Sequence, residues 1–375
     1  MTRLLAAVAA TLLLTAGCAQ STSEPPPAQG AVLPSATTEQ LTKDLTLALE
    51  KYRVPGGVVE VCSPGYDTWA TAAGVADVDA GTPMTTDLVW PLRSVTKSFT
   101  VTSILQLADE GRLVLSDPIS DYVAGVPNGD DITLGQLTAM TAGVPEYTTQ
   151  AWIKDYLRDE TRAFTTAELI DYANAEPAQF PPGTRAVYTN TSTLLLGEVV
   201  SSVTGLPFDQ ALQEMILDPL GLTDTRYPIA ADDWSGPHPT GYQPGESGDL
   251  EAQGNNFTVF GPAGAMTSTL DDLCTWGTAL GSGELLQPAT QRERLKGQPL
   301  DKGPEYDEYG QGIGSLEGWV GHTGEGFGHT LAVMHNETTG TTAVVAMNAS
   351  GLKHHVPTRL FRTMASTLDA IPPVE

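Results

Sequence analysis

A serine and a lysine stand three residues apart in the stretch LRSVTKSFTV, residues 92–101. The apolar pattern that follows predicts a helix from residue 94 to residue 113, so Ser94 and Lys97 share one face and their side chains can meet. If this site is buried, loss of solvation lowers the lysine pKa, and the neutral amine can take the serine proton. The pair would then make a nucleophile, although the same spacing is common on solvated helices.

Two further segments carry polar groups that could serve such a nucleophile. In FPPGTRAVYTN a Pro-Gly turn precedes Tyr188 and Asn190. Tyr188 could relay protons, or it could be a half-buried tyrosine with a satisfied hydroxyl while Asn190 caps a helix predicted at residues 191–204. In WVGHTGEGFGHTLAVMH, a His-Thr-Gly triplet leads into a strand, where N–H groups can bind an oxyanion, although such a triplet alone is more often a turn.

Taken together and in this order, the three segments resemble the serine β-lactamase and penicillin-binding protein family. The class A members of that family carry Ser-x-x-Lys, Ser-Asp-Asn and Lys-Thr-Gly. Here the second element is YTN and the third is HTG, which is similar to the branch of class C β-lactamases and D-alanyl-D-alanine carboxypeptidases. Stretches such as LQLADEGRLVLSDPISDYV and GPAGAMTSTLDDL extend the resemblance from about Leu41 to Asn348.

The resemblance implies a role for each matching residue on the helical side. Ser94 would be acylated, Lys97 would be its base, and Tyr188 would carry protons to the leaving group and from the deacylating water. Asn190 would bind a substrate amide.

On the strand side the resemblance places His322, Thr323, Gly324 and Glu325 at the substrate, with the N–H groups of Ser94 and Glu325 as the oxyanion hole. Two residues depart from the family pattern. His322 replaces the usual lysine, so a permanent positive charge is absent. Glu325 shares the face of Thr323 by strand alternation, and at ~5 Å it would cost a substrate carboxylate about 3 kcal/mol.

The chain is predicted to form an α+β fold, with helix and sheet patterns at both ends around a helical middle. The resemblance implies an α/β/α sandwich, with a mainly antiparallel sheet built from both termini and an inserted all-helical subdomain. We expect a single catalytic domain at 38–370, with a sheet part (38–93 and 265–370) and a helical part (94–264). A long loop at 227–264 has no readable periodicity and is expected to cover the cleft.

The N-terminal residues predict export. Residues 1–17 read as a signal peptide and end at Cys18 in LLTAGC, which resembles a bacterial lipobox, so we expect lipidation there, with plain secretion as the alternative. Residues 18–37 read as a Pro/Ser-rich tether to the outer face of the cytoplasmic membrane. Cys62 and Cys274 remain in the folded part, where they could pair, but the sequence cannot show whether they approach.

Charge and missing motifs exclude several classes of function. Nineteen Lys and Arg against 45 Asp and Glu give a net charge of −26, which repels nucleic acid and anionic lipid. Neither Gly-x-Ser-x-Gly nor His-Glu-x-x-His occurs, and we expect no cofactor and no metal.

The expected protein is thus a monomeric, cell-envelope serine hydrolase that meets the membrane only through a lipid anchor. The substrates that the resemblance implies are D-amino-acid peptides or amides of the wall, cleaved in the manner of a D-alanyl-D-alanine carboxypeptidase. An esterase or a weak β-lactamase on the same fold is the alternative, and a non-catalytic penicillin-binding-like lipoprotein is an alternative of another class.

Overall fold

Residues 30–374 of the chain are described here from a computed structural model, so the predicted signal peptide and Cys18 lie outside the described residues. The α-helices are α1 (Ser35–Tyr52), α2 (Thr96–Asp109), α3 (Leu134–Thr138), α4 (Gln150–Tyr156), α5 (Thr166–Asn174), α6 (Asn190–Thr204), α7 (Phe208–Leu212), α8 (Asp218–Leu220), α9 (Leu270–Ser282), α10 (Pro288–Arg294) and α11 (Val356–Asp369). The short helices are η1 (Arg93–Val95), η2 (Ile119–Asp121), η3 (Gly129–Asp131), η4 (Gln213–Leu217), η5 (Phe257–Val259) and η6 (Gly261–Ala263).

An eight-stranded antiparallel sheet runs in the order β3-β2-β1-β12-β11-β10-β9-β8. The strands of the chain are β1 (Gly56–Cys62), β2 (Trp69–Asp77), β3 (Thr82–Pro83), β4 (Trp90–Pro91), β5 (Gly241–Pro244), β6 (Leu250–Gln253), β7 (Thr267–Ser268), β8 (Glu308–Tyr309), β9 (Gly314–Leu316), β10 (Trp319–Gly326), β11 (His329–His335) and β12 (Thr342–Met347). The first three and the last five of these strands form the sheet, which confirms a mainly antiparallel sheet built from both ends of the chain.

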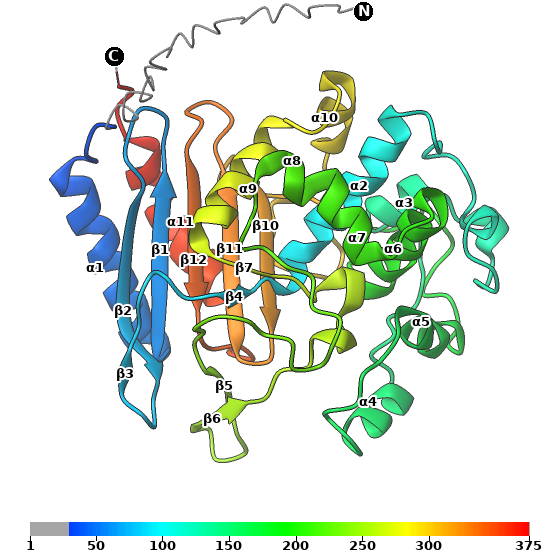
Figure 1. Cartoon of the computed structure of the whole chain (residues 1–375), viewed down its shortest axis with the longest axis horizontal. Coiled ribbons are helices and arrows are strands. Elements are labelled where there is room, and N and C mark those ends of the chain that lie inside the picture. The colour runs from blue at the N-terminus through cyan, green and yellow to red at the C-terminus, as the bar shows by residue number, and fades with distance from the viewer. Residues whose placement is uncertain (1–29, 375) are drawn as a thin grey trace, which may run out of the picture.

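Helices cover both faces of the sheet (Figure 1). On one face α1 packs beside α11, and its leucines four residues apart, Leu41, Leu45 and Leu49, point into the core. On the other face α9 lies over β11 and β12. The central strands are buried on both faces and therefore read as nearly continuous apolar runs, as in VVAM of β12.

The helical part lies beside β10 and is organised around α2 (Figure 1). Most of α2 is buried, which explains why the residues after Lys97 carry no charge until Asp109. Its neighbours α6 and η6 pack along it, and a small two-stranded sheet of β4 and β7 joins the chain where it enters and leaves the helical part.

Two local predictions need correction. Residues 30–34 are not a free tether, because Ala31 bridges to Tyr66, Leu33 is buried and α1 already begins at Ser35. The loop at 227–264 is not without structure, since it holds the hairpin of β5 and β6 and two short helices. These elements are short and rich in polar turn residues, so they show no hydrophobic periodicity in the sequence.

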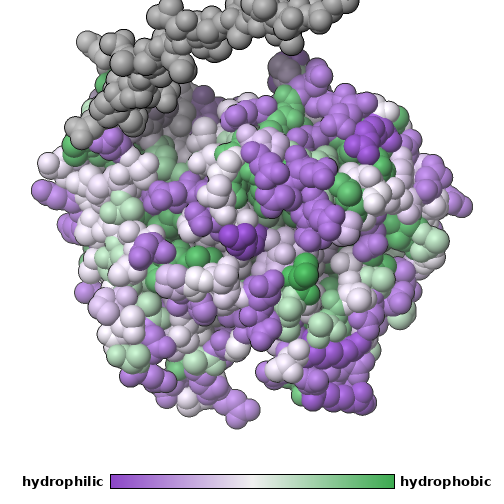
Figure 2. All heavy atoms as spheres, in the orientation of Figure 1, coloured by the Kyte–Doolittle hydropathy of each residue, from purple (hydrophilic) through white to green (hydrophobic). Residues whose placement is uncertain are grey.

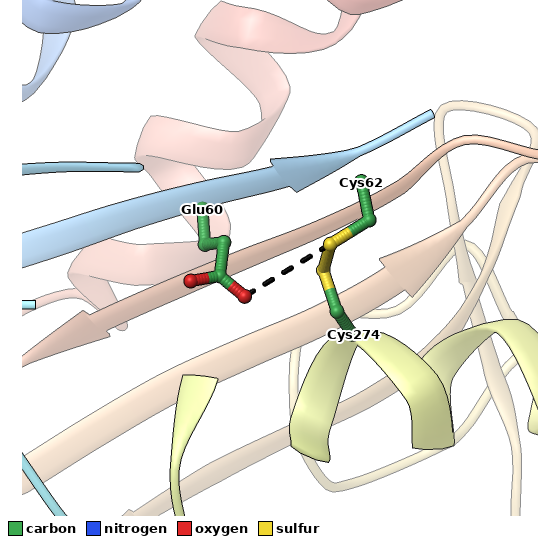
Figure 3. A group of neighbouring side chains, drawn as sticks. All are labelled: Glu60, Cys62 and Cys274. Atoms are coloured by element: carbon green, nitrogen blue, oxygen red, sulfur yellow. Dashed lines mark hydrogen bonds between the residues drawn. A yellow bond between two sulfur atoms is a disulfide. The ribbon is translucent and has the colours of Figure 1, made fainter. Parts of the chain in front are cut away.

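Cys62 at the end of β1 and Cys274 on α9 form a disulfide, with Cα atoms 6.2 Å apart (Figure 3). It ties the sheet to the helix that covers it, and it resolves a pairing that the sequence left open. Glu60 is buried beside it, and burial, helped by the charge of Asp271, raises its pKa to about 8. A disulfide sulfur has no proton, so the dashed contact of 3.9 Å in Figure 3 requires a protonated Glu60.

The surface agrees with the acidic composition. Figure 2 shows hydrophilic residues over much of the viewed face, with hydrophobic residues in small separate patches. Among the described helices, none combines the length and the apolar character that crossing a bilayer requires.

Candidate active site

A pocket of about 350 Å³ opens where η1 meets the edge of β10. Ser94, Thr323 and Glu325 line it, so the structure brings the first and third sequence segments together. The remaining lining comes from two loops that the sequence did not connect with the site, Gly303–Glu305 and Leu352–His355.

The predicted contact between the side chains of Ser94 and Lys97 is formed. Ser94 lies in η1 just before α2, and Lys97 Nζ is fully buried 3.0 Å from Ser94 Oγ. Lys97 Nζ also lies 2.6 Å from Asn190 Oδ1 and 2.8 Å from the carbonyl oxygen of Ala263. A neutral amine has two N–H donors for these acceptors and one lone pair for the Ser94 hydroxyl, so the geometry fits a base.

Burial lowers the pKa of Lys97 to about 7, although the nearby Glu146 carboxylate opposes the shift. A large fraction of Lys97 is therefore uncharged at neutral pH, as a general base requires. A lysine at the start of a buried helix thus becomes, through its desolvation, an amine that can act as a base.

Tyr188 and Asn190 face the same pair. Lys97 Nζ lies 5.0 Å from the centre of the Tyr188 ring. The buried Tyr188 hydroxyl makes no hydrogen bond of good geometry with the described residues. Burial, with Tyr309 and Tyr306, holds the pKa of Tyr188 well above its usual value, and the nearby Ser94 side chain opposes this only in part. Tyr188 is therefore a neutral phenol that can give a proton.

Asn190 does not cap its helix. Thr189 is the N-cap of α6, with its side chain accepting from the N–H of Thr191, which frees the Asn190 amide to meet Lys97. The structural alternative considered for Asn190, a helix cap, is thus wrong.

Glu146 is a site residue that the sequence analysis missed. Its Oε2 accepts from the backbone N–H of Asn190 at 2.8 Å and from Asn190 Nδ2 at 3.2 Å. A chain of contacts therefore runs from Glu146 through Asn190 to Lys97 and Ser94. The only signal in the sequence was one carboxylate in the apolar turn AGVPEY, and it gave no hint of a partner 44 residues away.

His322 is buried behind the pocket and is not part of its lining. Its Nε2 lies 3.1 Å from the hydroxyl of Tyr309, and its Nδ1 lies 3.2 Å from that of Tyr306. Burial, reinforced by the charge of Lys97, lowers the pKa of His322 to about 3. The imidazole is therefore neutral, and the positive charge that a lysine would bring to this position is absent.

The outer edge of β10 carries the backbone N–H groups that were expected to bind an oxyanion. The N–H of Thr323 points away from β11 and donates to the Tyr306 hydroxyl at 2.7 Å, so by ladder alternation the N–H of Glu325 points to the same edge. Gly324 lets η1 approach closely, because a Cβ atom there would lie 2.4 Å from the carbonyl oxygen of Leu92. The N–H groups of Ser94 and Glu325 can thus converge.

Glu325 lies on the pocket side, as strand alternation predicted, and its Oε1 accepts from the N–H of Gly351. Lys353 and two histidines, His354 and His355, line the same pocket. His355 lies 3.0 Å through Nε2 from the carbonyl oxygen of Gly324, and burial lowers its pKa although Glu325 opposes this. Lys353 thus brings to the pocket a basic side chain that the sequence did not connect with the site, from the loop before α11.

One cluster of potential metal ligands occurs in the described part of the chain: Glu60, Cys62 and Cys274. It lies between β1 and α9, outside the pocket lining, and its two sulfurs are bonded to each other (Figure 3). A disulfide offers no thiolate to a metal ion.

A family model described as Beta-lactamase matches residues 37–363. Among curated proteins, "Penicillin-binding protein 4" of Amycolatopsis lactamdurans is 31% identical over 178 residues, and a "Beta-lactamase" of Escherichia coli K12 is 28% identical over 273 residues. These matches cover 46% and 71% of this chain, and they span only 44% and 64% of the two relatives.

Solved structures share the whole fold. A D-stereospecific amidohydrolase from a Streptomyces species superposes with a TM-score of 0.76 and 27% identity, covering 88% of this chain and 98% of that one. A D-amino acid amidase from Ochrobactrum anthropi SV3, complexed with L-phenylalanine amide, superposes with a TM-score of 0.77 at 24% identity, covering 90% and 97%.

Proposed function

Because the chain belongs to the beta-lactamase family, we propose that it is a serine hydrolase that forms an acyl-enzyme on Ser94. The observation that carries the proposal is the Lys97 amine, buried 3.0 Å from the Ser94 hydroxyl with its pKa lowered to about 7. A solvated lysine on an ordinary helix face would have neither property.

The reaction follows from the contacts. Lys97 takes the proton of Ser94 as Oγ bonds to the substrate carbonyl carbon, and the developing oxyanion meets the N–H groups of Ser94 and Glu325. Tyr188 protonates the leaving amine as the tetrahedral intermediate collapses and regains a proton through Lys97. Water then attacks the acyl-enzyme by the reverse proton path and releases the acid.

For the substrate we propose D-amino-acid amides or peptides. The 27% identity to a D-stereospecific amidohydrolase over nearly its whole length supports an amide of a D-amino acid. The neutral His322 and the exposed carboxylate of Glu325 favour a substrate that presents a neutral or cationic group, because an anionic group near Glu325 is repelled.

A carboxypeptidase action on a free terminal carboxylate is the second candidate. The position of Lys353 in the pocket lining favours it. Lys353 is the lysine on the pocket wall, and its flexible side chain can reach an anion. A hydrolysis panel of D-amino-acid amides, D-Ala-D-Ala peptides, p-nitrophenyl esters and nitrocefin separates these candidates from an esterase and a β-lactamase.

Covalent labelling tests the acyl-enzyme itself. Intact protein incubated with a fluorophosphonate should gain one adduct by mass, and Ser94→Ala should gain none. An adduct that persists in Ser94→Ala, or no adduct on the unchanged protein, would favour the non-catalytic binding protein instead.

We further propose that the protein is exported and lipid-anchored through Cys18. The disulfide between Cys62 and Cys274 supports export, because disulfides persist mainly in oxidising compartments. Radiolabelled palmitate should be incorporated by the full chain in a lipoprotein-processing bacterium and lost in Cys18→Ser, while Cys62→Ala keeps the label. Labelling of Cys18→Ser would contradict the anchor.

A further inference from the structure

Arg93, the residue before the nucleophile, is fully buried. Its Nε donates to the carbonyl oxygen of Gly326 at 3.0 Å, and one terminal nitrogen donates to Asn255 Oδ1. The other terminal nitrogen has no partner among the described residues. Three aromatic rings face the guanidinium within 6 Å of its carbon: Phe257, Phe260 and Phe327.

This cation has no acidic partner in the described part of the chain. Burial lowers the pKa of Arg93 to about 9, which still leaves it protonated at neutral pH. A buried charge without a carboxylate costs stability, and an apolar side chain of similar volume would avoid that cost. The position therefore holds a residue that folding alone does not favour.

The place of Arg93 in the chain indicates what it does. Its backbone, with φ at 48°, turns directly into Ser94, which supplies one oxyanion donor. Its side chain holds Gly326, which follows Glu325, the source of the other donor. Between them, the Gly324 backbone packs against Leu92 and Arg93. Arg93 thus connects the two expected oxyanion donors: its main chain leads into Ser94, and its guanidinium holds the residue after Glu325.

We propose that Arg93 is a positioning residue that fixes the distance between the N–H groups of Ser94 and Glu325 during acyl transfer. The proposal rests on the proposed acyl-enzyme at Ser94. The planar guanidinium of Arg93 reaches Gly326 and Asn255 together and lies among the aromatic rings. A lysine ammonium cannot make both hydrogen bonds and these ring contacts at once. The donors act only on the tetrahedral oxyanion, so Arg93 should affect the transition state and not ground-state binding.

Arg294 provides a matched control. It is equally buried, burial lowers its pKa to about 9, and it donates to the carbonyl oxygens of Gln311 and Ser98. Neither of these hydrogen bonds involves Ser94 or Glu325, so a comparison of Arg93→Met with Arg294→Met separates positioning from general core disruption. Asn255→Ala removes the loop contact of Arg93 and leaves its contact with Gly326.

The experiment measures the second-order rate constant for labelling of Ser94 by a fluorophosphonate, and the affinity for a boronic acid that mimics the tetrahedral adduct. We expect Arg93→Met to lower both by about 100-fold, as a displacement of about 1 Å at the reacting centre would. Arg294→Met and Asn255→Ala should lower them less than about five-fold. Thermal unfolding checks that the variants are folded.

The outcomes are distinct. If the unchanged protein is not labelled, the acyl-enzyme itself is wrong. If it is labelled and Arg93→Met is labelled at the same rate, or Arg294→Met loses as much, Arg93 has no positioning role. If Arg93→Met does not fold, Arg93→Lys takes its place: a parallel loss of labelling rate and boronate affinity supports the role, and unchanged values overturn it.

Discussion

The two sides of the pocket, a helical wall around Ser94 and a strand wall formed by β10, differ in how deeply their charged groups are buried. The helical wall is a closed network in which Lys97, Asn190 and Glu146 meet at 2.6 to 3.2 Å and Lys97 is fully buried. The strand wall is open, with Glu325 exposed and Lys353 beside it. A closed network can shift pKa values, whereas an open wall can only attract or repel. In the proposed reaction the helical wall would therefore supply the chemistry, and the strand wall would select the substrates that reach it.

Replacing the base should have the largest effect. Lys97→Met should lower the acylation rate about 10³-fold, since general base catalysis is lost. Between pH 7 and 10.5 the unfolded chain holds a proton on Lys97 that the folded protein releases, so this group makes the native protein more stable as pH rises through that window. That slope should disappear in Lys97→Met, as measured by denaturant unfolding at several pH values.

Changing the strand wall should alter selectivity instead. Glu325→Gln should raise kcat/KM for anionic substrates relative to neutral ones by about 100-fold, the equivalent of about 3 kcal/mol at 5 Å. Glu305→Gln is the control, because Glu305 lines the same pocket but pairs with Arg359. Equal changes for anionic and neutral substrates would mean that the strand wall does not select by charge.

Glu146→Gln tests whether the network tunes the base. The Glu146 charge raises the pKa of Lys97, so its removal should move the acid limb of the pH–rate profile, expected near pH 7, to lower pH. A loss of about ten-fold in kcat/KM should accompany the shift, from the weakened hold on Asn190. A limb that moves to higher pH would contradict the role of Glu146.

Removing the disulfide should affect neither wall. The double change Cys62→Ala, Cys274→Ala should lower the free energy of unfolding by about 2–5 kcal/mol and leave kcat and KM unchanged. The native sequence with its disulfide reduced should show the same loss of stability and the same kcat and KM. A change in kcat would show that the helical wall depends on the link between β1 and α9.

The sequence predicted what local pattern determines. The helix of Lys97, the strands of both ends and the three motifs follow from short-range periodicity and spacing, and the structure brings Ser94, Thr323 and Glu325 to one pocket. Contacts between distant segments could not be read in this way. Glu146 meets Asn190 across 44 residues, and Lys353 joins Glu325 in the lining of one pocket from a loop before the last helix.

Burial of the motif residues was equally hidden. Nothing near His322 in the sequence shows that Tyr306 and Tyr309 enclose it, because both come from the segment before β9 and fold back over β10. The sequence therefore indicated a missing charge at His322 but not that the ring lies out of reach of solvent.

The outer edge of β10 pairs with β9 from Trp319 to Gly321, and beyond that point Tyr306 takes the N–H of Thr323 while η1 packs against Gly324. Coverage of this kind protects a strand edge from pairing with the edge of a neighbouring molecule. The carboxylate of Glu325, on a chain of net charge −26, makes such stacking between copies unfavourable. Glu325, which is proposed to select substrates by charge, thereby also disfavours the association of copies along this strand edge.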